Sequence, residues 1–575
     1  MTGNKLGLFN GKDRPDVESA WKLYEDSESF NTAINLADTV KVNENFYVGK
    51  QWEGVESNGL PTPQFNFLKR VVGFIVATIT TDNVKVTASP LAATPNTDEL
   101  IEPARIVNEE FEALTERNNI PALLREYARN AAVDGDGCLY SWWDPDMETG
   151  QEARGGVKTE VIENTRVRFG NPNDRKVQSQ PWILITRQSI VREAKLRARE
   201  NGIAEWDAIQ PDGVDQYMDD AKRTGDKVTE LLLLWRDRDS GEIWAYESTR
   251  QSAIREPYST GIRLYPICWL NWDYVQDCYH GQAMITGLIP NQIFVNKIWA
   301  ASMLSFLKTA YPKVIYDKTR IKNWDNRVGA AIGINGGDVN TVARNMDPAT
   351  ISPQIAQFIQ LAVEMTEQSL GATSVALGDT RPDNTSAIIA LQRAAATPSE
   401  MTKQNLYKSV EDLYRIYLEF MGGFYGTRMV DMDTPEQLRQ VFQFAGQEMP
   451  DEISMPFDFS MLRDHPMTLK LDVGASSYYS EIASMQTLDN LLMNGHITAV
   501  QYLERIPDGY IPARRALINE LKAAQMQAMA QPMNAAGGGG GPILQDIGKP
   551  EIPTGGGFSD LQRKVLQTGT TEGMV

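Results

Sequence analysis

The sequence contains few of the residues from which most metal and catalytic sites are built. It has 3 cysteines and 3 histidines in 575 residues. A small, odd number of cysteines in a long chain is typical of a reducing compartment, so we expect no disulfide framework. Cys268, Cys278 and His280 lie close together in the sequence, but their spacing matches no common zinc motif. They form either a metal site or buried thiols beside a loop histidine. We expect the second, with no metal and no cofactor.

Motifs for nucleotide chemistry are also absent. No G-x-x-x-x-G-K-[ST] occurs, which excludes an ATP-driven motor of the phosphate-loop type, and no G-x-G-x-x-G follows a strand pattern. A Ser-His-Asp site requires a positioned histidine base, and His280, His465 and His496 have no recognisable catalytic setting. We therefore predict that the protein is not an enzyme. The enzymatic alternative is a metal-independent hydrolase on an α+β scaffold.

Long apolar runs are missing as well. No stretch approaches the roughly 18 residues that a membrane-spanning helix requires. The best candidate, VVGFIVATITT (Val71–Thr81), is too short and is typical of a buried helix. The opening residues, MTGNKLGLFNGKDRPD, contain no apolar core of a secretory signal. We therefore expect neither secretion nor a membrane partner.

Basic residues are in the minority. The chain has 56 Lys and Arg against 75 Asp and Glu, a formal net charge of −19. Proteins that hold nucleic acid by its phosphates present a basic face, because counterion release supplies much of the affinity. The chain as a whole is therefore not a tight nucleic-acid binder. The charge indicates either an ordinary solvated acidic surface or a surface that lies near DNA without adhering to it.

The length and the order of segments predict a multidomain α+β protein. After a polar N-terminal arm at residues 1–45, residues 46–280 are expected to form an α+β domain. Its strand patterns come in runs without alternating helices, which argues against a doubly wound sheet. Three helices are expected in its first part, at about Gln64–Thr80, Glu99–Arg117 and Ala122–Ala132.

A helix–hairpin–helix pattern follows. A helix over Gly281–Ala310 contains Pro290 and is apolar on more than one side, which indicates burial between neighbours in this chain or another subunit. Residues 311–352 predict short strands with glycine turns. A second helix is expected over 353–370, with Ser352 as its cap.

The C-terminal part begins with a charged loop at residues 371–385, which contains GDTRPDN. A long helix and returning strands follow over residues 386–475, and helices are expected over residues 476–531. The tail at residues 532–575 is rich in glycine and proline and is expected to be disordered.

Five segments in this order resemble tailed-bacteriophage portal proteins. They are FYVGKQWEG, FNFLKRVVGFIVATITTDNVKVTASP, HGQAMITGLIPNQIFVNK, LGATSVALGDTRPDNTSAIIALQ and LKLDVGASSYYSEIASMQTLDNLL. Together they span about residues 45–500. The resemblance implies a structural ring, usually dodecameric, at the unique capsid vertex of the virion, assembled in the host cytoplasm. Double-stranded DNA would be packaged and ejected through its channel.

The resemblance also implies subdomains and partners. It assigns a wing (46–280), stem helices (281–310 and 353–370), a clip (311–352), a tunnel loop (371–385), a long helix with wing return (386–475) and a crown (476–531). The implied partners are other copies of the chain, the major capsid protein, the terminase large subunit, head-completion or adaptor proteins, scaffold protein and non-specifically passing DNA. The alternative within phages is another head–tail structural or adaptor protein, although adaptors are generally much shorter.

The resemblance gives the charged loop a role. In portal rings the corresponding segment projects into the channel. The residues that would contact DNA are Gly378, Asp379, Thr380, Arg381, Pro382, Asp383 and Asn384. Pro382 lowers the conformational entropy of the loop, and Arg381 offers one phosphate contact beside the repulsive Asp379 and Asp383. The alternative is a surface connection between two helices, capped by Asn384 or Thr385.

Overall fold

The computed structural model divides into two compact units, Met1–Ile482 and Ala483–Val575. The residues that it describes are 14–57, 59–81, 84–91, 100–150, 153–212, 226–310, 314–325, 327, 331–345, 354–369, 400–433, 452–465, 467–473, 478–494, 496–506, 514, 517–518 and 521. Within these ranges, no helix has both the length and the apolar character that crossing a membrane requires.

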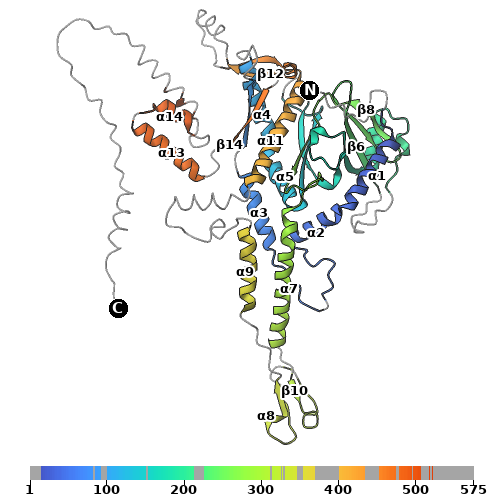
Figure 1. Cartoon of the computed structure of the whole chain (residues 1–575), viewed down its shortest axis with the longest axis vertical. Helices are drawn as coiled ribbons and strands as arrows, with labels where there is room; N and C mark the ends of the chain where they lie inside the picture. Colours follow the sequence, from blue (N-terminus) through green and yellow to red (C-terminus); the bar gives the residue numbers. More distant parts are fainter. Residues whose placement is uncertain are drawn as a thin grey trace, which may run out of the picture. The chain divides into compact units, whose positions relative to one another are not determined.

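The first unit contains a five-stranded antiparallel sheet with the order β4-β5-β6-β7-β8 (Figure 1). Its strands are β4 (Val167–Phe169), β5 (Trp182–Ile190), β6 (Lys227–Arg236), β7 (Ile243–Ser248) and β8 (Ala253–Ser259). Side chains alternate between the two faces of a strand. Leu231, Leu233 and Trp235 of β6 accordingly pack with residues of α1 (Val17–Ala33), including Trp21.

A second, three-stranded sheet has the order β3-β2-β9, formed by β3 (Gly156–Ile162), β2 (Asp136–Asp144) and β9 (Ile267–Asn271). One large apolar cluster joins residues of both sheets to the helices α3 (Phe67–Thr80), α4 (Ile101–Arg117), α5 (Ile120–Asp134) and α11 (Glu400–Phe420). α11 continues as a π-helical turn at Met421–Tyr425. The strands come in runs, as predicted, and the mixed α+β fold is confirmed.

Three two-stranded antiparallel sheets complete the strand pairing of the described residues. They are β1 (Val84–Pro90) with β14 (Met467–Val473), β10 (Val314–Tyr316) with β11 (Ala343–Asn345), and β12 (Thr427–Asp433) with β13 (Glu452–Asp458). The first of these pairs brings together segments almost 400 residues apart in the chain, since Val84 lies opposite Val473.

Two long helices lie side by side in the first unit, α7 (Met284–Ala310) and α9 (Gln354–Ser369) (Figure 1). The Asn291 amide of α7 donates to the Thr366 hydroxyl of α9 at 3.0 Å. Between the two helices in sequence lie the β10–β11 pair and the short α8 (Val339–Val342). The predicted helix–hairpin–helix order is therefore confirmed for the described residues.

The remaining helices of this unit include α2 (Leu36–Val48) and α6 (Val191–Glu200). Short 3-10 helices occur at Asn164–Arg166, Val177–Ser179, Trp206–Ala208 and Phe459–Arg463. The predicted helices before residue 135 form, but α3 begins at Phe67 and not at Gln64, and α5 extends two residues beyond its predicted span at each end. α1 and α2 were not predicted from the sequence. α1 begins at a capping box, in which Asp16 and Ser19 bond each other's backbone N–H.

α13 (Tyr478–Met493) runs across the boundary between the units, and α14 (Ala499–Arg505) lies in the second unit. A small apolar cluster of Val500, Leu503, Ile506 and Ile518 forms there. Helices were predicted in this region, and the described part contains them.

Candidate functional site

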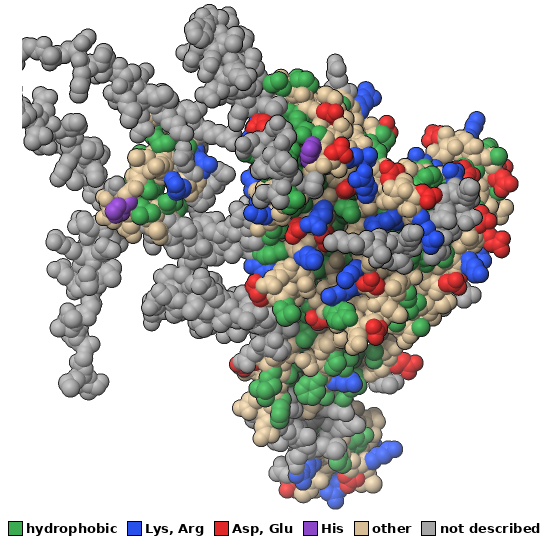
Figure 2. Space-filling model, turned by 45° about the horizontal axis from the view of Figure 1, so that its top comes forward, with side chains coloured by type: hydrophobic (Ala, Val, Ile, Leu, Met, Phe, Trp, Pro, Cys, Tyr) green, Lys and Arg blue, Asp and Glu red, His purple; other side chains and the backbone are tan. Residues whose placement is uncertain are grey.

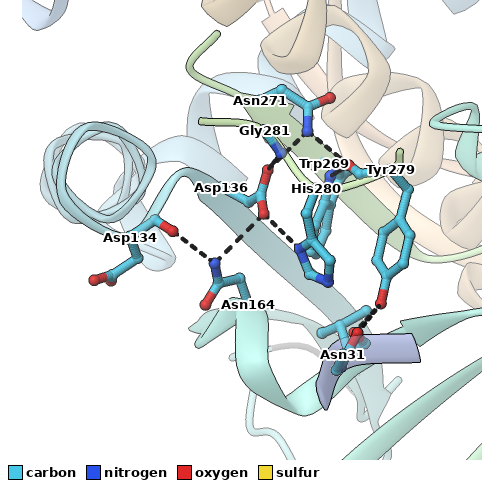
Figure 3. Close-up of polar contacts among 10 residues, drawn as sticks. Asn31, Asp134, Asp136, Asn164, Trp269, Asn271, Tyr279, His280 and Gly281 are labelled. Carbon is cyan, nitrogen blue, oxygen red and sulfur yellow. Dashed lines mark hydrogen bonds and ion pairs between the residues drawn. The ribbon is translucent and has the colours of Figure 1, made fainter. Parts of the chain in front are cut away.

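A buried carboxylate lies at the point where the chain enters α7. Asp136, at the start of β2, is 0% exposed. One of its oxygens accepts hydrogen bonds from the Gly281 N–H and the Asn271 amide, both at 2.7 Å (Figure 3). The other lies 2.6 Å from His280 Nδ1 and 3.4 Å from the Asn164 amide. A carboxylate is tolerated in a protein interior only when its oxygens are satisfied in this way.

Two glycines bring the backbone close enough for these bonds. Gly135 connects α5 to β2 with φ +102°, a conformation that favours glycine. A Cβ atom at Gly135 would lie 2.6 Å from the carbonyl oxygen of Gly281, and a Cβ at Gly281 would lie 3.0 Å from that of Gly135. The segment that leads into α7 therefore rests directly on the turn between α5 and β2.

The His280 ring is enclosed by aromatic side chains. Its centre lies 3.9 Å from that of Tyr279 and 5.7 Å from that of Trp269. The Tyr279 hydroxyl in turn donates to Asn31 of α1 at 3.3 Å (Figure 3). His280 is only 3% exposed, and its Nε2 has no hydrogen-bond partner among the described residues. The His280–Asp136 pair resembles part of a catalytic dyad, but a substrate cannot reach it, so we assign the pair a structural role.

Two of the cysteines lie near His280 in the sequence. Cys268 is buried and Cys278 is half-buried, and both are free thiols. Burial raises the pKa of the Cys268 thiol well above its ordinary value, which keeps the group protonated. Within the described ranges, no group of three or more His, Cys, Asp and Glu side chains is arranged to hold a metal ion. The cluster consists of one buried and one half-buried thiol near His280.

Buried amides fasten one side of α7 to the N-terminal helices. The Asn43 amide of α2 donates to the Thr286 hydroxyl of α7 and to the Val133 carbonyl of α5, both at 2.9 Å. Because Asn43 is 1% exposed, it contributes directional bonds inside an otherwise apolar contact.

A second set of amides lies further along α7. The Gln292 amide donates to the Phe65 carbonyl at 2.5 Å and to Asn296 Oδ1 at 2.9 Å, and the Asn296 amide donates to Gln51 Oε1 at 2.7 Å. The Phe65 ring stacks on Trp299 with ring centres 4.7 Å apart. These contacts hold the chain between α2 and α3 against α7.

Large apolar side chains are exposed elsewhere on α7 and on α9. Phe306 is 64% exposed and Met365 is 62% exposed. The others are Phe294, Met303 and Leu307 on α7, and Phe358 and Leu361 on α9. Figure 2 shows hydrophobic side chains at the surface of this part of the first unit. Contiguous exposed apolar surface of this kind is typical of a protein–protein contact.

Acidic groups lie close together at the end of α5. The Arg129 guanidinium bonds Glu44 and lies 3.7 Å from Asp134. Burial and the negative charge of Glu44 together raise the pKa of Asp134 to about 8. The Asp134 carboxyl group is therefore mostly protonated at neutral pH.

The seven residues of the sequence-predicted channel loop, 378–384, lie outside the described residues. Of the residues that position α7, the sequence singled out only His280, as a neighbour of two cysteines. A signal for two others was available, since Gln292 and Asn296 are polar residues four positions apart in a predominantly apolar helix. Asp136 carries no such signal in its local sequence.

The first prediction concerns Asp136. The Asp136→Asn substitution should lower the unfolding free energy by about 2–4 kcal/mol, because an NH₂ group would face groups that are themselves donors. The apparent thermal midpoint of the purified protein measures this loss. Asp146→Asn, at an exposed position, makes the same charge change and should leave the midpoint nearly unaltered. Equal midpoints for the two variants would contradict the role of Asp136.

The second prediction concerns pH. The folded protein retains a proton on Asp134 that the unfolded chain loses near pH 4, so this group makes stability fall as pH rises from about 4 to about 8. The slope for one proton is at most about 1.4 kcal/mol per pH unit. Asp134→Asn should therefore stabilise the protein at pH 8 and have little effect at pH 4. Thermal midpoints across this range test it, and parallel curves for variant and wild type would refute it.

The central part of the chain, which includes α7 and α9, matches a known protein family. The family model described as Phage P22-like portal protein matches residues 188–441, a region that begins in β5 and includes α7, α9 and α11. Among proteins with curated functions, none matches the chain. Residues 188–441 are therefore similar to the phage P22-like portal protein family, which confirms the resemblance to tailed-phage portal proteins that the sequence segments indicate.

Proposed function

We propose that the protein forms the portal ring at the unique capsid vertex of a tailed phage, and that double-stranded DNA is packaged and ejected through it. The family match over residues 188–441 is the observation that carries this proposal. The ring is expected to be dodecameric, as the resemblance implies. The protein would act as a passive channel, with ATP hydrolysis supplied by a separate terminase.

The exposed apolar faces of α7 and α9 support assembly. Each helix contacts the other, and each also presents large apolar side chains that the described residues leave exposed. Burying such side chains contributes roughly 25 cal/mol per Å². If the covered face of one copy differs from the covering face of the next, the contact is head-to-tail, and it forms a ring when the rotation between successive copies closes.

The helix–hairpin–helix segment suggests which role each subdomain would have. α7 and α9 would be the stem, and residues 311–352 would be the clip on which terminase and head-completion proteins dock. The α+β region before α7 and the strands after α11 would form the wing, in contact with the capsid. The helices after residue 475 would form the crown.

The charged loop would line the channel. Each subunit would present Arg381 between Asp379 and Asp383, so a passing phosphate meets one attractive group and two repulsive ones. The net charge of −19 per chain would disfavour tight adhesion of DNA to the ring.

The third prediction tests assembly through the exposed face of α7. Phe306→Asp should reduce the assembled fraction at least tenfold, because it places a charge in the proposed contact. Light scattering or native mass spectrometry of the purified protein measures that fraction. Leu196→Asp changes an exposed leucine on α6, 52% exposed against 64% for Phe306, and should assemble normally. If Phe306→Asp assembles like the wild type, α7 does not form the ring contact.

The fourth prediction tests the channel loop. An Asp379→Asn and Asp383→Asn double variant should form normal rings but package DNA more slowly, because removal of two repulsive charges lets phosphates adhere at Arg381. Adding Arg381→Ala should restore packaging toward the wild-type rate. The amount of nuclease-protected DNA per capsid is the readout. Wild-type packaging by the double variant would place the loop outside the channel.

A further inference from the structure

A cavity of about 440 Å³ lies between the two sheets of the first unit. One wall comes from β2 and includes Tyr140 and Trp142, and the other comes from β6 and includes Glu230, Leu232 and Leu234. These three β6 residues alternate with the leucines that pack with α1, so the cavity occupies the second face of the five-stranded sheet. Its volume is in the range of small-molecule sites.

The cavity has an aromatic wall. The Tyr140 and Trp142 rings are stacked, with centres 5.6 Å apart and planes inclined by 17°. Trp143 stacks on Phe424 at 5.1 Å, and both also line the cavity. Phe424 belongs to the π-helical turn after α11, a rare feature that is frequent at functional sites. A flat ring is the shape that such a wall accommodates best.

The carboxylates that line the cavity both accept hydrogen bonds from the chain. Glu230 is 6% exposed and accepts hydrogen bonds from Arg197 and from the Ser189 hydroxyl. Glu247 accepts a hydrogen bond from the Tyr258 hydroxyl at 3.1 Å. A ligand with a donor or a positive charge would therefore have to compete with existing bonds.

The arginines that line the cavity include Arg255 and Arg187. Arg255 lies 3.5 Å from the centre of the Tyr258 ring. No carboxylate oxygen of the described residues forms an ion pair with its guanidinium, although Glu247 is its cross-strand neighbour. Arg187 pairs with Glu160 at 3.1 Å, in an exposed contact that is worth little. Arg255 is thus the group best able to bind a ligand's negative charge.

We infer that this cavity binds a small, planar aromatic molecule that carries one negative charge. Its ring would lie between the Tyr140–Trp142 wall and Leu232, and its anionic group would bond Arg255 at the rim. An Arg–anion hydrogen bond is about twice as strong as a neutral one, so the charge should contribute measurably to affinity. The inference does not depend on the portal proposal, because the cavity lies within one chain.

The experiment uses the full chain with 2-naphthoate and its neutral amide, 2-naphthamide, as probes, and measures binding by calorimetry. The wild type should bind 2-naphthoate saturably and about tenfold more tightly than the amide. Arg255→Gln should remove this preference by weakening naphthoate about tenfold and the amide less than twofold. Leu232→Trp should abolish binding of both by filling the cavity.

Arg192→Gln is the matched control, since Arg192 is an exposed arginine on α6 that does not line this cavity. It should bind naphthoate like the wild type. No saturable binding by the wild type would overturn the inference, as would naphthoate binding that Arg255→Gln leaves unchanged. Because Arg255 is exposed, its variant is expected to fold even if Leu232→Trp does not, and circular dichroism checks both.

Discussion

The position of α7 depends on the buried carboxylate of Asp136. Its hydrogen-bond partners come from three separate places: the 3-10 helix at Asn164–Arg166, the end of β9, and the segment leading into α7. A carboxylate in a protein interior is costly unless all these groups are in place together. The network therefore fixes one arrangement of the α5–β2 turn, β9 and the start of α7. The close approach of Gly135 and Gly281 allows no other residue pair at this point.

From this anchored end, α7 meets two different environments. Its first half is held by directional bonds from Asn43 and Gln51 in addition to apolar packing. Its second half presents side chains such as Phe306, which the described residues leave exposed. This difference suits a helix that is anchored in its own subunit by its first half and contacts a neighbour with its second. A rigid attachment within the subunit would define the angle at which successive copies meet.

Periodicity made much of the fold predictable. The helix α7 was predicted from the spacing of its apolar residues, and β5 and β6 from their apolar runs. Both signals can be read from a short stretch of sequence. α1 and α2 were missed because their apolar faces are weak and their burial comes from distant partners, such as Trp182 on the sheet. Asp136 could not be predicted, because its donors lie up to 145 residues away and no local pattern marks them. The channel loop was inferred from resemblance, and its residues lie outside the described ranges.

The mass of the purified wild-type protein in low-salt buffer tests the central claim most directly. Native mass spectrometry or light scattering should detect a species near twelve times 64.2 kDa. Such a species would agree with a head-to-tail ring built on the exposed apolar side chains of α7 and α9. A 64.2 kDa monomer that persists at high concentration, and also when capsid and scaffold proteins are added, would contradict it.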